Sequence, residues 1–397
     1  GCYHQRFGTY YYQSGGIEQS EYRTIAEILK NEGYYNGYIG KLHYGRNDKN
    51  INKRSFPLNH GYDYFYGHTS ARKHYLIHNE QAEQVFQRTK KEFERTGQSL
   101  QKGPFWENNN QIDVEGFSTE LFGKKACEFI SSHKDNPFFL TLSFNAVHNF
   151  THQLPTDYLK RNHLKGYRDW DPSKEEYMDW YEKGRYPNNP EGRQLYLGQL
   201  QFLDIEIGRV LDCLEKNNIT ENTLIIYVSD NGGPLGIYAN NYPLAGGKYT
   251  LHEGGLKVPM IFSWKGEIGE GQVVENVIST MDILPTICDY TGAKIPDNID
   301  GLSIKELLNG KNPQLKNDTL VWDTGFEQAV RVGKWKLKIV SDEAATRYEN
   351  NGLVAGRFLY DLEKDVGETT NVAGMYPDKF EALKKVYENW KNQIKNH

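Results

Sequence analysis

Hydrophobic and polar positions along the chain alternate between a helical period and short apolar runs, and this order occurs three times. Residues 24–33, TIAEILKNEG, have a capping-box spacing between Thr24 and Glu27 and predict a short helix before the strand YYNGYIG. Residues 119–133 predict a helix before the apolar run 138–144, and residues 196–219 predict a long helix before the strand LIIYVSD. Each strand is followed by a polar loop.

This pattern predicts an α/β fold. Nearly continuous apolar strands that alternate with helices are typical of a mostly parallel central sheet sandwiched by helices. KVPMIFSW, residues 257–264, reads as one more such strand. From about Leu320 the pattern changes to alternating strands with a glycine turn and a closing helix, which predicts a small antiparallel sheet plus helix. We therefore expect a main α/β domain at 1–315 and an α+β subdomain at 316–397.

Composition excludes several classes of function. The 397 residues carry 47 Lys and Arg against 52 Asp and Glu, a net charge of -5 without a basic block, so a nucleic-acid partner is not expected. No apolar run approaches the roughly twenty residues that cross a bilayer, and no membrane span is predicted. The 4 cysteines are scattered without a CxxC pair, which argues against a structural zinc site.

The residues that could carry chemistry follow the predicted strands. Ligands of open parallel sheets bind outside the carboxyl ends of the strands, where loops from several strands meet. There the sequence places Lys41 and His43, then His148, and then Asp230 and Asn231; a glycine-rich loop adds Lys248. Cationic and proton-donating groups of this kind suit a tetrahedral oxyanion such as sulfate or phosphate, although each side chain alone could be an ordinary solvated or hydrogen-bonded group.

Asp230 and Asn231 together offer hard oxygen ligands. A carboxylate and an amide carbonyl suit Ca²⁺ or Mg²⁺ better than a soft metal, and two ligands are too few for calcium. The alternative is that Asp230 only caps a turn whose glycines permit positive φ.

Five segments in this order resemble the type I sulfatases, the formylglycine-dependent sulfate-ester hydrolases of the alkaline phosphatase superfamily. They are YIGKLHYG, PFFLTLSFNAVH, LIIYVSDNGGP, GGKYTLHEGGLKVPMIFSW and LYDLEKDVGETTNV, and together they cover nearly the whole chain. The resemblance implies that Asp230 and Asn231 are two ligands of a calcium ion and that Lys41 and His43 hold the formylglycine hydrate and a sulfate oxygen. It also implies that His148 and Lys248 face the ester oxygen, as candidates for protonating the leaving group.

One part of the family pattern is absent from this sequence. The family's nucleophile is a cysteine, sometimes a serine, in a C-x-P/A-x-R motif that is oxidised to formylglycine, and an earlier strand supplies an Asp-Asp pair to the metal. In CYHQR the cysteine Cys2 and the arginine have the right offset, but His4 stands where Pro or Ala belongs. GCYHQRFG aligns better just after the nucleophile helix, so we expect the formylglycine upstream of Gly1 and interpret the chain as truncated at its amino end.

The resemblance predicts a sulfuric ester hydrolase of arylsulfatase type. The segment HTSARKHYLIHN contains Arg72 and His74, which favour a sulfated glycan as substrate. The alternative is that this segment is an ordinary solvated surface loop. Two rivals stay open: a phosphodiesterase or phosphonate hydrolase of the same superfamily, and a non-catalytic glycan-binding descendant. For the full-length form we expect a periplasmic or secreted location.

Overall fold

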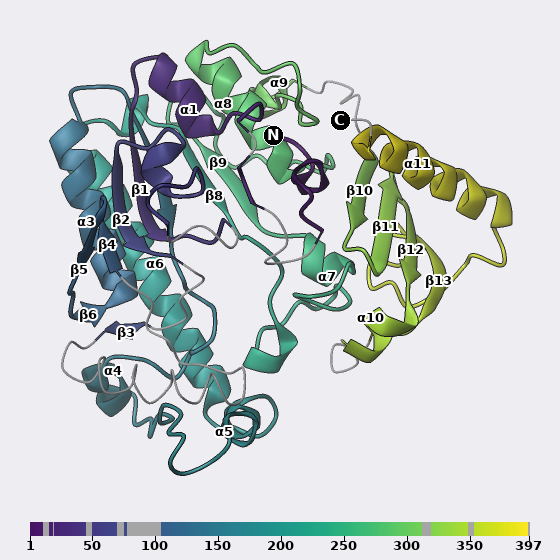
Figure 1. The fold of residues 1–397 in the computed structure, drawn as a ribbon, viewed down its shortest axis with the longest axis horizontal. Helices are drawn as coiled ribbons and strands as arrows, with labels where there is room; N and C mark the ends of the chain where they lie inside the picture. The colour runs from purple at the N-terminus through teal and green to yellow at the C-terminus, as the bar shows by residue number, and fades with distance from the viewer. Residues whose placement is uncertain are drawn as a thin grey trace. The chain divides into compact units, whose positions relative to one another are not determined.

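The computed structural model describes residues 1–10, 16–18, 20–44, 50–69, 75–77, 105–311, 319–347 and 353–395. Contacts within the chain divide it into two units (Figure 1). The five-stranded unit comprises residues 17–220 and 236–238, and the four-stranded unit comprises residues 1–16, 221–235 and 239–397. The boundary that the sequence predicts at residue 316 stays a prediction.

A mixed sheet with a parallel centre forms the core of the five-stranded unit. β1 pairs in parallel with both β2 and β7, while β4 and β5 extend the sheet in antiparallel fashion in the order β5-β4-β2-β1-β7. The strands are β1 (Tyr35–Lys41), β2 (Tyr64–His68), β4 (Phe105–Glu107), β5 (Asn110–Ile112) and β7 (Phe138–Ser143), and a separate antiparallel pair is β3 (Leu76–Ile77) with β6 (Gly116–Phe117). The carboxyl ends of β1 and β7 therefore lie at one edge.

Helices pack on both faces of this sheet. α1 (Ile25–Asn31) begins at the predicted capping box, in which the Thr24 hydroxyl accepts from the Glu27 N–H at 3.1 Å and the Glu27 carboxylate accepts from the Thr24 N–H at 2.8 Å. α3 (Ser118–His133) buries Phe122, Ala126 and Phe129 against the other face. α6 (Gly192–Lys216) packs on α3. The described residues of this unit also form α4 (Thr156–Arg161) and α5 (Tyr177–Gly184).

β2 is a strand that the sequence does not predict. Residues 44–117 lack a clear hydrophobic period, yet Tyr64–His68 lies between β1 and β4 with four of its residues buried. Its aromatic side chains, Tyr64, Phe65 and Tyr66, bury large area in both core clusters of the sheet. Aromatic residues favour strands, but a run of only three gives a weak signal, because β-propensity depends on packing partners supplied by the rest of the fold.

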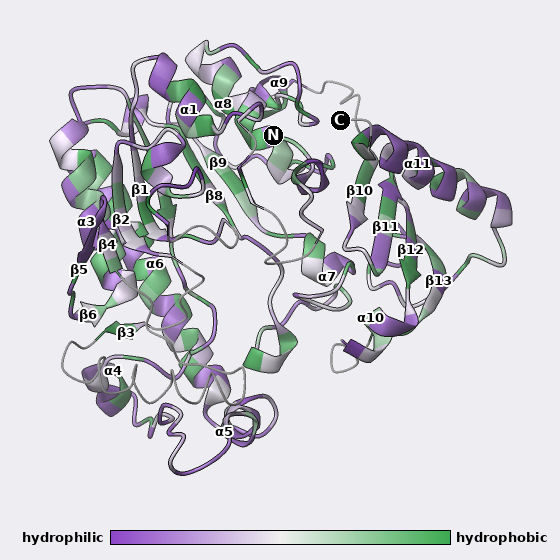
Figure 2. Cartoon of the chain, viewed as in Figure 1, coloured by the Kyte–Doolittle hydropathy of each residue, from purple (hydrophilic) through white to green (hydrophobic). Residues whose placement is uncertain are grey.

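The four-stranded unit contains the antiparallel C-terminal sheet that the sequence predicts. Its strands follow the chain order β10 (Thr319–Asp323), β11 (Glu327–Val332), β12 (Trp335–Val340) and β13 (Gly356–Asp361). α11 (Pro377–Lys395) packs Phe380, Leu383 and Trp390 against this sheet, and its outer side is hydrophilic (Figure 2). Shorter helices of the unit are α7 (Glu253–Leu256), α8 (Ile283–Thr291), α9 (Lys305–Leu308) and α10 (Asp342–Arg347).

β8 (Ile225–Val228) and β9 (Met260–Ser263) are strands as predicted, but they form an antiparallel pair of their own. The sequence suggested that KVPMIFSW adds another parallel strand. Short apolar runs identify a strand but not its neighbour or its direction, since the same residues satisfy either ladder.

Among the described residues no helix is both long enough and apolar enough to cross a membrane. This finding agrees with the composition.

His60 makes the stability of the five-stranded unit depend on pH. Its ring is fully buried between Tyr44 and Tyr62, and its Nδ1 lies 2.6 Å from the Arg54 carbonyl oxygen. Burial lowers the pKa of His60 to about 4 from an ordinary value of 6.5. The folded state thus holds fewer protons than the unfolded state between these values. Neutral His60 therefore contributes about 3 kcal/mol to the free energy of unfolding. This contribution is complete above pH 6.5 and is lost as the pH falls towards 4.

We expect the free energy of unfolding to decrease more steeply between pH 6.5 and 4 in the wild-type protein than in His60→Gln, whose side chain does not titrate. Urea unfolding of both proteins at pH 7.5, 5.5 and 4.5 measures this difference. Parallel pH profiles for the two proteins would contradict the assignment.

Candidate active site

The first group of candidate residues lies at the carboxyl edge of the five-stranded sheet. Lys41 is the last residue of β1, His43 follows it on the exposed surface, and His148 lies in the loop after β7. Because β1 and β7 are parallel and Gly40 pairs with Ser143, both loops leave the same edge. The structure therefore brings the loops that carry Lys41, His43 and His148 to one end of the sheet, as the sequence predicts.

Backbone hydrogen bonds fix the loop that carries Lys41. The Tyr38 hydroxyl donates to the Lys41 carbonyl at 2.6 Å, and the Leu42 N–H donates to the His68 carbonyl at 2.8 Å. The buried His68 ring in turn lies with Nε2 2.9 Å from the Asn145 side-chain oxygen in the loop after β7. The ends of β1, β2 and β7 are thus tied to one another directly behind the candidate side chains.

Tyr75 holds the loop of His148. Its hydroxyl accepts from the His148 N–H at 2.8 Å and lies 2.9 Å from the His148 carbonyl oxygen. The Tyr75 N–H donates to Gln153 at 2.9 Å. Burial raises the pKa of Tyr75, so its hydroxyl keeps its proton. A proton on His148 Nδ1 would donate to the Asn149 carbonyl oxygen 3.1 Å away, and Nε2 would then be the nitrogen that exchanges a proton.

The second group of candidate residues lies in the four-stranded unit. Asp230 and Asn231 follow β8, with the Asp230 side chain at the surface. The Asn231 amide nitrogen donates to the Gly232 carbonyl at 2.9 Å, which orients the amide so that its oxygen points away from that carbonyl. The Ser229 hydroxyl donates to the Asn231 carbonyl at 3.0 Å. These contacts give the two residues a defined local conformation at the strand end.

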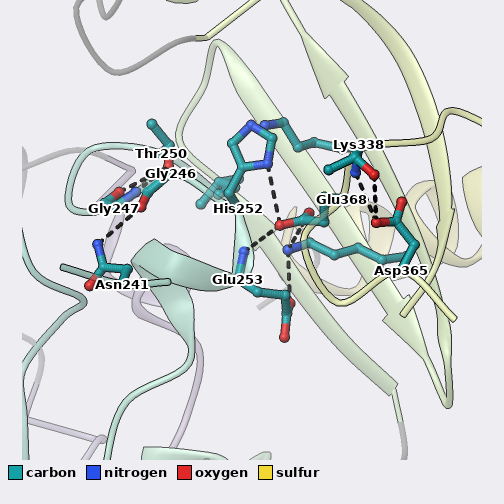
Figure 3. Close-up of polar contacts among 12 residues, drawn as sticks. Asn241, Gly246, Gly247, Thr250, His252, Glu253, Lys338, Asp365 and Glu368 are labelled. Atoms are coloured by element: carbon teal, nitrogen blue, oxygen red, sulfur yellow. Dashed lines mark hydrogen bonds and ion pairs between the residues drawn. The ribbon is translucent and has the colours of Figure 1, made fainter. Parts of the chain in front are cut away.

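Asn241 joins this loop to the loop that carries Lys248. Its amide oxygen accepts from the Gly233 N–H at 3.1 Å, while its amide nitrogen donates to the carbonyls of Gly233 at 2.7 Å and Gly246 at 3.0 Å. The Lys248 N–H lies 3.4 Å from the Gly233 carbonyl oxygen. Figure 3 shows Asn241 beside Gly246 and Gly247. The structure therefore places Lys248 on a loop bonded directly to the one that carries Asp230 and Asn231.

Tyr249 shows that this turn is strained. It has a φ of 78°, a left-handed conformation that non-glycine residues seldom adopt, and half of its side chain is exposed. The Lys248 ammonium lies 5.5 Å from the centre of the Tyr249 ring, a cation-π distance. Strained backbone of this kind is concentrated at functional sites, where the surrounding structure maintains it.

Comparison with protein-family models identifies the chain. Residues 1–293 match the model described as Sulfatase, and residues 247–396 match the model for the C-terminal part of N-sulphoglucosamine sulphohydrolase. The first match covers well over half of the chain.

The chain belongs to the sulfatase family.

Relatives of known name support this membership. The chain is 27% identical to an arylsulfatase of Hemicentrotus pulcherrimus over 89% of its own length and 62% of the relative, and 28% identical to N-acetylgalactosamine-6-sulfatase of Mus musculus over 82% and 56%. It is 31% identical to a sulfatase of Formosa agariphila over 69% and 50%. The chain thus spans between half and about three fifths of the length of these sulfatases.

Solved structures confirm the fold class predicted from the sequence. The crystal structure of Ps i-CgsB in complex with k-i-k-neocarrahexaose matches with a TM-score of 0.75 at 24% identity, over 98% of this chain and 79% of that one. The PsFucS1 sulfatase from Pseudoalteromonas sp. matches with a TM-score of 0.67 at 21% identity, over 98% and 77%. The alkaline phosphatase-like α/β fold with its small C-terminal antiparallel sheet is that of the sulfatases.

The donor chemistry of Asp230 and Asn231 fits a hard cation, but only in part. Calcium takes six to eight oxygen ligands, and these two side chains supply a carboxylate and an amide oxygen. Within the described ranges, no group of three or more His, Cys, Asp or Glu side chains is arranged to hold a metal ion. A complete sulfatase metal site would therefore need further oxygen ligands.

The described part of the chain gives no support to Cys2 as a nucleophile. Burial raises the pKa of the Cys2 thiol. A thiol with a raised pKa forms less of the reactive thiolate at neutral pH. The other sequence-predicted residues, Arg72 and His74, lie outside the described residues.

Sequence reasoning missed Tyr75, Asn145 and Asn241, which hold the candidate side chains in place. None of them belongs to a motif with chemistry of its own, and their contacts join segments far apart in the sequence. The one available signal was position in the sequence, since Asn145 lies within PFFLTLSFNAVH directly after its strand and Asn241 precedes the LAGGK loop. The predicted convergence of all six candidate residues in one pocket, across both units, stays a prediction.

Proposed function

We propose that the protein containing this chain hydrolyses sulfate esters, with water and RO–SO₃⁻ giving ROH and sulfate. The match of residues 1–293 to the Sulfatase model is the observation that carries the proposal. The arrangement of the candidate residues supports it, since Lys41, His43 and His148 leave one sheet edge, and Lys248 lies on a loop bonded to that of Asp230 and Asn231.

Each proposed role follows from the charge distribution of the reaction. A sulfate monoester carries delocalised negative charge, so Lys41 and His43 would stabilise the sulfate oxygens as hydrogen-bond donors. An alkoxide is a poor leaving group unless it gains a proton, and Lys248 or His148 would supply that proton to the ester oxygen. The hydrogen bonds from Tyr75 and Asn241 to these loops would keep the donors in place.

Two further groups belong to the proposal. Asp230 and Asn231 would hold a calcium or magnesium ion. When bound, this ion would offset the negative charge of the sulfate group. The nucleophile would be a formylglycine formed from a residue upstream of Gly1, and it would supply an oxygen nucleophile to the sulfur. The residues of this chain would bind and orient the sulfate and move the proton.

A sulfated glycan is the proposed substrate class. One relative bears the name N-acetylgalactosamine-6-sulfatase, and BT4656, a solved structure of similar fold, was determined in complex with its substrate D-glucosamine-2-N,6-O-disulfate. Arg72 and His74 remain proposed sugar-binding residues. We also propose that the full-length protein is secreted or exported to a periplasm.

Sulfate release by the full-length protein tests the proposal. We expect sulfate from an aryl sulfate and faster release from a sulfated oligosaccharide, together with a peptide that shows the mass change from cysteine to formylglycine. Cleavage of a phosphate diester but not of a sulfate ester would favour the phosphodiesterase alternative. Glycan binding without turnover by protein that carries the formylglycine would indicate a binding-only descendant.

A further inference from the structure

A buried cluster of charges attaches the Lys248 loop to the C-terminal sheet. Lys336 of β12 has no exposed surface, and its ammonium lies 2.8 Å from Glu253 Oε1 and 3.0 Å from Glu368 Oε1. Arg331 of β11 reaches the other oxygen of Glu253 at 3.2 Å, and His252 Nδ1 lies 3.3 Å from Glu368 Oε2. We call these five residues the Glu253 cluster, of which Figure 3 labels His252, Glu253 and Glu368.

Buried carboxylates also hold the backbone of this loop. The Glu253 N–H donates to Glu368 Oε2 at 2.6 Å, and the Leu251 N–H donates to Glu327 Oε2 at 3.1 Å. Glu327 in turn lies 3.2 Å from the ammonium of Lys338, the second buried lysine of β12. The backbone amides of Leu251 and Glu253 are therefore held by acidic side chains of β11 and of the loop after β13.

Buried ion clusters of this kind often contribute little net stability. Removing charges from water costs several kcal/mol for each ion, and well-packed apolar residues often stabilise a fold as well or better. Burial alone would raise the pKa of Glu368, but the neighbouring His252 and Lys336 lower it to about 2, so its charge is retained. Glu368 also has a φ of 51°, an unfavourable conformation for a non-glycine residue. A cluster maintained at this cost indicates a positional role.

The cluster lies next to the turn that presents Lys248. Thr250 closes the turn, because its N–H and its hydroxyl donate to the Gly247 carbonyl at 3.0 Å and 2.9 Å. On the other side of the turn, the Gly254 N–H donates to the Ala245 carbonyl at 2.8 Å. Lys248 is thus separated by only two residues from Leu251, whose amide is held by Glu327. Movement at residues 251–253 would be transmitted directly to Lys248.

We propose that Glu253, Lys336 and Glu368 are positioning residues that set the place of Lys248 for the reaction. The proposal rests on the proposed function, because Lys248 is useful in this position only if it acts on a sulfate ester. The three residues need not touch the substrate. They hold the far end of the turn 247–250 against the C-terminal sheet.

Glu368→Gln and Lys336→Met test the proposal in the full-length protein. Glu368→Gln keeps the shape and an acceptor for the Glu253 N–H but removes one charge partner of Lys336, so it should fold even if Lys336→Met does not. Because misplacing a reacting group by about 1 Å can cost 100-fold, we expect kcat for sulfate release to fall about 10- to 100-fold with KM changed less than about twofold. Lys334→Met is the control, since Lys334 lies in the turn between β11 and β12, its side chain is 41% exposed and it pairs with Glu363.

Hydrogen exchange of residues 245–256 provides a readout that needs no catalysis. We expect faster exchange there in Glu368→Gln than in the wild type, with unchanged exchange in α11 and in the Lys334→Met control. Unchanged exchange in 245–256, or faster exchange with unchanged kcat in an active enzyme, would overturn the proposal. Failure of the unmodified protein to release sulfate would count against the proposed function. The exchange measurement does not depend on catalysis, so it tests the attachment of the loop separately.

Discussion

Replacing Lys248 with alanine is expected to lower kcat/KM for sulfate release by a factor of about 100 to 10,000. This range is what loss of one proton donor or one oxyanion-stabilising group costs in other enzymes. Lys248 lies in a strained turn, next to the loop of Asp230 and Asn231, and it is attached to that loop by Asn241. Initial rates of sulfate release from an aryl sulfate by both proteins measure the effect.

Two companion variants make this result specific. Lys257→Ala removes an exposed lysine nine residues further along and should leave the rate unchanged. Lys248→Arg keeps the positive charge but gives up its proton far less readily. Recovery of most of the rate by arginine would assign Lys248 to charge stabilisation, and continued loss would assign it to protonating the leaving group. Full activity of Lys248→Ala would remove Lys248 from the proposed site.

Replacing Gly40 with alanine is expected to destabilise the protein by about 2 to 6 kcal/mol, the sum of backbone strain and overpacking. Gly40 has a φ of 118°, and a Cβ there would lie 2.0 Å from the Ser143 carbonyl oxygen of β7. This contact is with backbone, which cannot move aside without separating β1 from β7. Urea unfolding followed by far-UV circular dichroism measures the change.

Gly208 provides the matched control. It lies within α6, where a Cβ would have no neighbour within 4 Å, so Gly208→Ala should be neutral or stabilise by up to about 1 kcal/mol. Equal stabilities of Gly40→Ala and the wild type would show that the end of β1 is more adaptable than its geometry indicates. Because Lys41 follows directly, a folded Gly40→Ala protein should also lose sulfate-releasing activity.

The fold could be predicted where local pattern and tertiary structure agree. Thr24 and Glu27 form their capping box because both partners lie within one helical turn. β2 was not predicted, because Phe65 and Tyr66 form a strand only with β1 and β4 on either side. The antiparallel pairing of β8 and β9 depends on which strands meet, and that information is not present in a run of four apolar residues.

The sequence predicts candidate side chains for the site but not the residues that support them. Lys41 and His148 are candidates because residues after parallel strands meet at one edge. Tyr75, Asn241 and Lys336 could not be found in this way, because each acts on a segment distant in the sequence or on backbone groups that carry no motif. Buried lysines such as Lys336 are also rare enough that sequence patterns place them at the surface by default.

The attachment of the Lys248 loop to β11 and β12 bears on how this chain could be divided by evolution or by engineering. The two family models overlap at residues 247–293, a stretch that begins with this loop. Glu253 comes from the shared stretch, whereas Lys336 lies on β12 of the C-terminal sheet and Glu368 lies in the loop that follows β13. A C-terminal sheet exchanged between homologues would bring its own charges to that loop. The Lys248 loop and the C-terminal sheet should therefore be inherited, and recombined, together.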